Sequence, residues 1–137
     1  MNENFIINKY FKPLSKNFEE ALNLSDDAAV LKSLKNRNLV VSVDNFIYGI
    51  HCPGYIGISR GVNRAILAAI SDLSAMAAKP YCIFISITLN KYNISPELLK
   101  DLKQGIRKAL KSTKTILAGG DLCSTSGAVS FSVTVIG

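Results

Sequence analysis

The residues of this sequence best suited to chemistry are its aspartates. Five of the six lie in short segments of small or apolar residues. Acidic residues are scarce in this chain, which has 10 of them against 16 basic residues. An ionised carboxylate beside apolar neighbours is unfavourable unless a cation or hydrogen-bond donors compensate it. Oxygen ligands from separate segments suit Mg²⁺, so the pattern predicts a magnesium site. The segments are Ser25-Asp26-Asp27-Ala28-Ala29, Ser42-Val43-Asp44-Asn45, Ile70-Ser71-Asp72-Leu73-Ser74 and Gly119-Gly120-Asp121-Leu122.

Taken one at a time, most of these aspartates also have a structural explanation. Asp26 fits the cap of a helix or turn better than a metal ligand, and Asp44 and Asp121 fit turns at strand ends equally well. Asp72 is different, because we expect it in mid-helix between Ile70 and Leu73, where Asp has a poor propensity and little water is available. At this position the sequence favours a function.

Composition indicates one folded domain over residues 1–137. This length supports a single core and is too short for two domains of ordinary size. The net charge of +6 could indicate an anionic partner, but only residues 100–114 are densely basic. Because this stretch lacks interleaved aromatic residues, we interpret it as a solvated helix face and expect no nucleic-acid partner.

Neither a membrane segment nor a metal–cysteine site is expected. The most apolar stretch, residues 65–78, is too short to cross a bilayer, and the first ten residues lack the apolar core of an export signal. A cytoplasmic protein is therefore predicted. The cysteines Cys52, Cys82 and Cys123 have no CxxC spacing and are interpreted as free thiols. The neighbouring His51 has the ordinary explanation of a surface or core histidine.

Hydrophobic periodicity predicts alternating helices and strands. Together they indicate an α+β domain with a mixed, mainly antiparallel sheet and helices on one face. The last strand alternates strongly up to the end of the sequence, and such an uncovered edge favours pairing with another chain, so we expect a homodimer. The predicted helices cover residues 5–11 (ended by Pro13), 59–78 (capped by Ser59) and 98–110 (capped by Ser95), and the predicted strands cover residues 38–43, 46–50, 81–89, 115–118 and 129–135.

In order and spacing, the four aspartate motifs resemble the N-terminal domain of the thiamine-monophosphate kinase family, within the aminoimidazole ribonucleotide synthetase superfamily. The resemblance covers nearly the whole chain. It implies transfer of the γ-phosphoryl group of ATP to thiamine monophosphate, giving thiamine diphosphate, with Mg²⁺ as cofactor. It also implies a homodimer in which two sheets join into a barrel, with the nucleotide near the interface.

The resemblance further implies roles for individual residues, without assigning a catalytic one. Carboxylates that hold Mg²⁺ against phosphate oxygens are what phosphoryl transfer requires. Because GxxxxGK[ST] and GxGxxG are both absent from the sequence, a P-loop or Rossmann site is unsupported. The implied metal ligands are Asp27, Asp44, Asp72 and Asp121 with Ser42 in the metal shell, the implied substrate contact is His51, and the implied ATP contacts are Gly120 and Asp121.

The sequence departs from the family pattern at several positions. Val43, Ala69 and Leu122 stand where the family has polar residues, and Ala77 stands for a glycine. The family's second domain has no counterpart in this chain. We therefore expect an incomplete or split enzyme, with a separate C-terminal half as a possible partner. The alternative is a non-catalytic nucleotide-binding or dimerisation module left from a decayed kinase.

Overall fold

One four-stranded sheet organises the molecule. The computed structural model describes residues 2–25, 28–32 and 37–137. The strand order is β1-β4-β2-β3, with β4 antiparallel to β1 and β2, and β2 parallel to β3. This confirms the predicted α+β class and the mixed, mainly antiparallel sheet. The strands are β1 (Val41–Ile47), β2 (Cys82–Asn90), β3 (Ile116–Thr125) and β4 (Ser130–Ile136).

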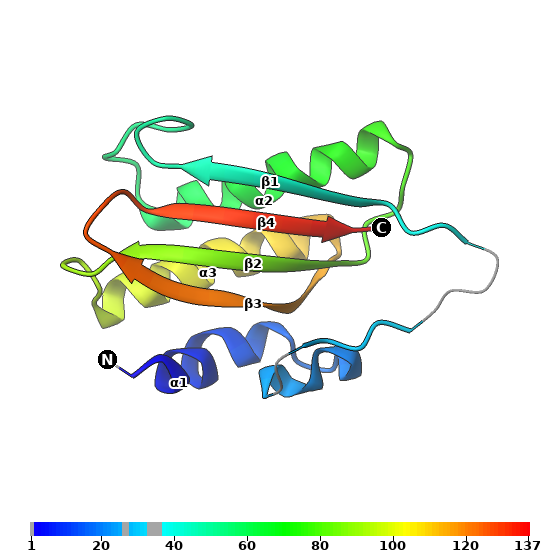
Figure 1. Cartoon of the computed structure of the whole chain (residues 1–137), viewed down its shortest axis with the longest axis horizontal. Coiled ribbons are helices and arrows are strands. Elements are labelled where there is room, and N and C mark those ends of the chain that lie inside the picture. The colour runs from blue at the N-terminus through cyan, green and yellow to red at the C-terminus, as the bar shows by residue number, and fades with distance from the viewer. Residues whose placement is uncertain (1, 26–27, 33–36) are drawn as a thin grey trace.

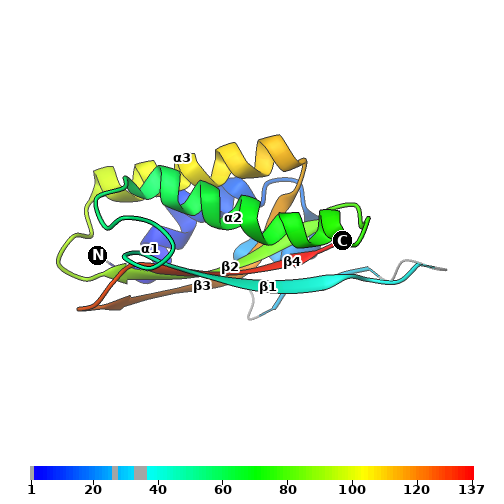
Figure 2. The same cartoon turned by 90° about the horizontal axis from the view of Figure 1, so that it is seen from above.

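Two long helices, α2 (Ile58–Ala75) and α3 (Pro96–Thr113), cover one face of the sheet, as Figures 1 and 2 show. Each helix buries an apolar stripe at helical spacing, and alternate strand residues meet those stripes. The predicted placement of the helices on one face is confirmed. Fully buried side chains of this core include Ile66 and Leu73 of α2, Leu102 and Ile106 of α3, and Ile83, Phe131 and Val133 of the sheet.

Local sequence fixes both the start of α3 and its closeness to α2. The Oγ of Ser95 accepts a hydrogen bond from the Leu98 N–H at 3.2 Å, and Pro96 occupies the first helical position, as predicted. At Gly105 the helix lies so close to the first turn of α2 that a Cβ would collide with the carbonyl oxygen of Ser59. The helix then connects two parallel strands, which require such a crossover.

The N-terminal segment runs along the β3 edge of the sheet (Figure 1). It contains α1 (Glu3–Ile6), a π-helical turn η1 (Ile7–Phe11) and two 3-10 segments, η2 (Lys12–Leu14) and η3 (Glu19–Leu24). The predicted helix over residues 5–11 is helical throughout, but it starts earlier, at Glu3, and Pro13 lies inside the following 3-10 segment instead of ending helical structure. Proline fits the first positions of a new short helix, where its missing N–H has no partner to lose.

Two predicted strands are a single strand. The stretches 38–43 and 46–50 were expected to be separate, with Asp44 at a strand end, but β1 pairs with β4 without interruption from Val41 to Ile47. The polar pair Asp44-Asn45 is tolerated because β1 is an edge strand whose side chains are only partly covered. Asp44 therefore lies in mid-strand and not in a turn.

The other elements differ from prediction at their ends. β3 extends to Thr125 instead of stopping at Ala118, because parallel pairing with β2 outweighs the weak strand propensity of Gly119 and Gly120. Helix α2 begins after Gly57 and has no side-chain cap, so the predicted cap at Ser59 is wrong. Within the described residues, none of the helices has the length and apolar character needed to span a membrane.

Candidate functional site

A serine and an aspartate meet where β1 passes α2. The Oγ of Ser42 in β1 donates a hydrogen bond to Oδ2 of Asp72 in α2, with 2.6 Å between the two oxygens. Ser42 faces the helix because side chains alternate along β1 and the buried Phe46, four residues further, faces the same core. Asp44 lies between them on this side and is partly buried. Three predicted metal-site residues therefore share one edge of the domain.

Asp72 lies in the last turn of α2 and is exposed, which corrects the expectation of a site with little water. A carboxylate here faces the negative end of the helix dipole, which is unfavourable by about 0.3–1 kcal/mol. The last turn contains no basic side chain to offset it. A bound cation would relieve this repulsion.

Gly120 and Asp121 lie at the opposite edge of the sheet. Asp44 is aligned across the strands with Val133, Ile85 and Gly120, so three strand spacings of about 4.8 Å separate it from Gly120, roughly 14 Å. Asp121 is aligned with Ser86 and Asn45, whose side chains point away from α2 and α3. Asp44 and Asp121 thus project from opposite faces, and one copy of the chain cannot bring both to a single ion.

No group of three or more His, Cys, Asp or Glu residues close enough to hold a metal ion occurs in the part of the chain that the structure describes. Asp27 lies outside the described residues, so its predicted role stays a prediction. The pair Ser42–Asp72 with Asp44 beside it still fits Mg²⁺, which keeps several waters and needs only one or two protein carboxylates alongside phosphate oxygens. All three donors are oxygens, as this ion prefers.

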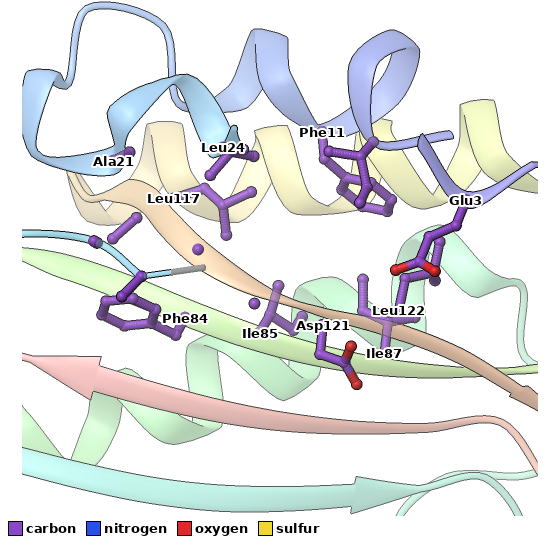
Figure 3. A pocket seen from close by; sticks show the side chains of 16 residues that line it. Glu3, Phe11, Ala21, Leu24, Phe84, Ile85, Ile87, Leu117, Asp121 and Leu122 are labelled. Carbon is purple, nitrogen blue, oxygen red and sulfur yellow. The ribbon is translucent and has the colours of Figure 1, made fainter. Parts of the chain in front are cut away.

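A cavity of about 290 Å³ adjoins Asp121, between the N-terminal segment and β3. Figure 3 shows the carboxylates of Glu3 and Asp121 toward one end and Ala21 with Leu24 toward the other. Gly119 and Gly120 form part of its wall. A Cβ at Gly120 would collide with the carbonyl oxygen of Ile85, so the strand pairing alone demands this glycine. Sequence reasoning missed Glu3, which stands in no aspartate motif.

His51 has a defined structural role. Its Nδ1 accepts a hydrogen bond from the Ile47 N–H at 2.9 Å, and its ring stacks on Phe46 with 5.5 Å between ring centroids. An accepting Nδ1 places the proton on Nε2. The side chain is exposed in the turn after β1, while the neighbouring Cys52 is buried and burial raises the pKa of its thiol. These contacts explain His51 without a ligand and leave Nε2 as a donor.

Two of the family departures, Val43 and Ala69, neighbour Ser42 and Asp72 along the chain, but their side chains lie in other environments. Ala69 of α2 is fully buried in the core, and Leu122 packs against the same core. Val43 is 60% exposed on the sheet face that lacks helices. Ala77 has φ = 53° just beyond α2, and the Ala78 N–H bonds back to the Leu73 carbonyl, which is the geometry of a left-handed helix C-terminus. Glycine is the residue best suited to this backbone position, which accounts for the family preference there.

Comparison with known proteins agrees with this architecture. The family model described as AIR synthase related protein, N-terminal domain, matches residues 25–137, and the chain belongs to this family. The thiamine-monophosphate kinase of Buchnera aphidicola subsp. Schizaphis graminum (strain Sg) is 34% identical over 137 residues, which is 99% of this chain and 41% of that protein. The chain thus spans about two-fifths of the length of this relative.

Solved structures show the same fold. The crystal structure of thiamine-monophosphate kinase from Stenotrophomonas maltophilia K279a matches with a TM-score of 0.74 and 29% identity, over 83% of this chain and 35% of that one. The structure described as AaThiL complexed with AMPPCP and TMP matches with a TM-score of 0.69 and 21% identity, over 82% of this chain and 35% of that one. At that identity the second likeness concerns the fold alone.

Proposed function

We propose that this chain is the nucleotide- and Mg²⁺-binding domain of a kinase that converts thiamine monophosphate to thiamine diphosphate. Family membership and the names of the relatives support this class of reaction. The observation that carries the proposal is the Ser42–Asp72 hydrogen bond with Asp44 beside it. It joins an edge strand and the end of a helix in an all-oxygen arrangement that the helix dipole makes unfavourable without a cation.

In the proposed reaction, a terminal phosphate oxygen of thiamine monophosphate attacks the γ-phosphorus of ATP. A new P–O bond forms as the bond to the bridging β,γ-oxygen breaks, and that oxygen leaves on ADP. Protein residues contribute mainly by positioning and by neutralising charge. Mg²⁺ would supply neutralisation of the phosphate oxygens, and Asp44, Asp72 and Ser42 would hold it.

We assign the nucleotide to the Gly119-Gly120-Asp121 side of the domain, and we propose that Mg²⁺ held at the Ser42–Asp72 edge meets its phosphates across an interface with a second copy of the chain. Strand residues without side chains let a phosphate or base approach the backbone closely, and the adjoining cavity has apolar walls suited to a planar ring. The exposed Nε2 of His51 is proposed to donate to the substrate. In the related structure the bound molecules are AMPPCP and TMP, which supports an ATP analogue and thiamine monophosphate as ligands.

A second copy of the chain is proposed to cover the sheet face that lacks α2 and α3. Apolar side chains such as Val41 and Val43, 57% and 60% exposed, lie on this face. Two such faces together would close a barrel and bury them. Sedimentation of the purified chain should give the dimer mass, and Val43→Lys should shift it toward monomer. A monomer for the wild-type chain at micromolar concentration would contradict this assembly.

Catalysis is proposed to need a further polypeptide segment equivalent to the rest of the relative's length. The matched relative has more than half of its length outside the aligned region. The test is an assay for thiamine diphosphate formation from ATP and thiamine monophosphate in the presence of Mg²⁺. It compares this chain alone with the chain to which such a segment has been added, and it assumes that the protein is cytoplasmic. We expect negligible turnover alone and measurable turnover together.

Binding is tested separately by calorimetric titration of AMPPCP with and without Mg²⁺. We expect Mg²⁺ to tighten binding by at least about tenfold, because two negatively charged groups must otherwise meet without a cation. Affinity that is absent, or identical in the two conditions, would refute the proposed function.

A further inference from the structure

Glu20 is a buried acid with no part in the site described so far. It is 6% exposed, and both of its carboxylate oxygens accept hydrogen bonds. The Lys32 N–H donates to Oε1 at 2.6 Å, and the Tyr81 hydroxyl donates to Oε2. The main-chain carbonyl of Glu20 also accepts from the Val30 N–H at 2.8 Å. Glu20 is therefore bonded to residues 10 and 12 positions further along the chain, Val30 and Lys32. Through Tyr81 it also links this segment to the sheet.

Tyr81 is held in place against the sheet by its backbone and by its ring. It directly precedes β2, its N–H donates to the Ile136 carbonyl at 2.8 Å, and its ring packs edge-on against Phe18 with 5.7 Å between centroids. The hydrogen bond to Glu20, together with burial, raises the pKa of Tyr81 to about 12. The hydroxyl therefore stays protonated, and able to donate, throughout the neutral range.

The described residues between Glu20 and Lys32, 21–25 and 28–31, contribute to one wall of the cavity at Asp121. Ala21, Leu24 and Ala29 line this cavity together with Gly120 and Asp121, and Figure 3 shows Ala21 and Leu24 away from the Asp121 end. The backbone of this stretch is strained, because Leu22, Asn23 and Leu24 have φ of 48°, 58° and 51°. Non-glycine residues keep this left-handed conformation only where surrounding contacts over-determine it. The bonds at Glu20 are the contacts that close this stretch at both ends.

We propose that Glu20 and Tyr81 are positioning residues that hold the wall formed by residues 21–25 and 28–31 against the Gly119-Gly120-Asp121 strand, and so shape the nucleotide cavity. This inference rests on the proposed function for the identity of the ligand. Neither residue contacts the ligand itself. The occupant is a nucleotide, and the effect of the two residues is on its affinity.

The neighbouring Glu19 provides a matched control. Its carboxylate lies 3.6 Å from Lys32 Nζ, but the two side chains are 89% and 72% exposed. Such a surface ion pair contributes little to stability. Two adjacent glutamates therefore both contact Lys32: Glu20 accepts a part-buried hydrogen bond from its backbone N–H, and Glu19 forms a surface ion pair with its side chain.

The test compares Tyr81→Phe, Glu20→Ala, Glu20→Gln and Glu19→Ala with the wild-type chain. Tyr81→Phe removes one hydroxyl and leaves a buried oxygen without its donor, whereas glutamine at position 20 can still accept from Lys32 and donate to Tyr81. Two measurements are made on each: hydrogen exchange of the amides of residues 21–32, and the dissociation constant of AMPPCP with Mg²⁺ by calorimetry.

We expect Tyr81→Phe and Glu20→Ala to speed exchange in residues 21–32 selectively and to weaken AMPPCP binding by about tenfold. Glu20→Gln should restore most of both properties, and Glu19→Ala should match the wild type. The inference is overturned if Tyr81→Phe and Glu20→Ala speed exchange in residues 21–32 but leave the AMPPCP dissociation constant unchanged. It is also overturned if neither variant changes the exchange rates. If the wild-type chain binds no AMPPCP, the proposed function fails and the positioning role falls with it, while normal wild-type affinity with unaffected variants removes the positioning role alone.

Discussion

The two edges of the sheet differ in whether their candidate site residues have a structural role when no ligand is bound. At the β1 edge, the acid of Asp72 sits in an unfavourable place and gains only one described side-chain hydrogen bond, from Ser42. At the β3 edge, Gly120 is demanded by strand pairing whether or not anything binds. The comparison favours a function at the Asp72 edge, because the carboxylate at the negative end of the α2 dipole is unfavourable and nothing in the fold requires it.

Gly120→Ala should have the largest effect and should test the structural side of this comparison. The new Cβ would collide with the Ile85 carbonyl oxygen, so we expect destabilisation of about 3 kcal/mol by urea unfolding. Gly127→Ala is the control, because its Cβ would meet only Thr125 at 3.7 Å. Equal stability of the two variants would show that Gly120 is present for ligand approach and not for the strand.

Asp72→Asn should separate function from stability at the other edge. The amide removes the charge that opposes the helix dipole, so the stability of the ligand-free chain should change by no more than about 0.5 kcal/mol. Mg²⁺-dependent AMPPCP binding should weaken by about tenfold. Asp101→Asn on α3 provides the comparison for loss of an exposed charge. A large loss of stability with normal nucleotide affinity would make Asp72 a structural residue.

Ala77→Gly should stabilise the helix end that carries Asp72. Alanine at φ = 53° is strained and glycine is not, so we expect a gain of about 1 kcal/mol, seen as a higher melting temperature. Ala68→Gly, in the middle of α2, should have the opposite sign because glycine weakens a helix interior. The same sign for both would mean that the turn is not left-handed.

The titration of Tyr81 should have the smallest effect near neutral pH. Its pKa of about 12 exceeds the ordinary value of 10.0, so the unfolded chain loses this proton first as the pH rises. The stabilisation is complete below about pH 10 and is lost between pH 10 and 12. Tyr48, whose pKa burial raises to about 12, behaves alike. Ultraviolet titration should therefore show two tyrosines that ionise near pH 12, and Tyr81→Phe should leave one. If two such tyrosines remained in the variant, the contact between Tyr81 and Glu20 would be contradicted.

Motifs with local causes were predictable from the sequence. The Ser95-Pro96 start of α3 depends on a side chain three residues from the amide it caps, and the alternation of residues 129–135 produces a strand in any half-buried sheet. The aspartate motifs in order were enough to indicate the family, which the match over residues 25–137 bears out. The split of β1 and the early end of β3 were wrong because pairing with neighbouring strands outweighed local propensity.

The tertiary structure alone decided which of those residues meet. Ser42 and Asp72 are 30 positions apart, and only the packing of α2 on the sheet brings them to 2.6 Å. The same sheet sends Asp44 and Asp121 to opposite faces, since one residue of register reverses a side chain. The burial of Glu20 against Tyr81 joins residues 61 positions apart. The sequence determined the chemistry available in this protein, and long-range packing, which no local pattern encodes, determined where each group lies.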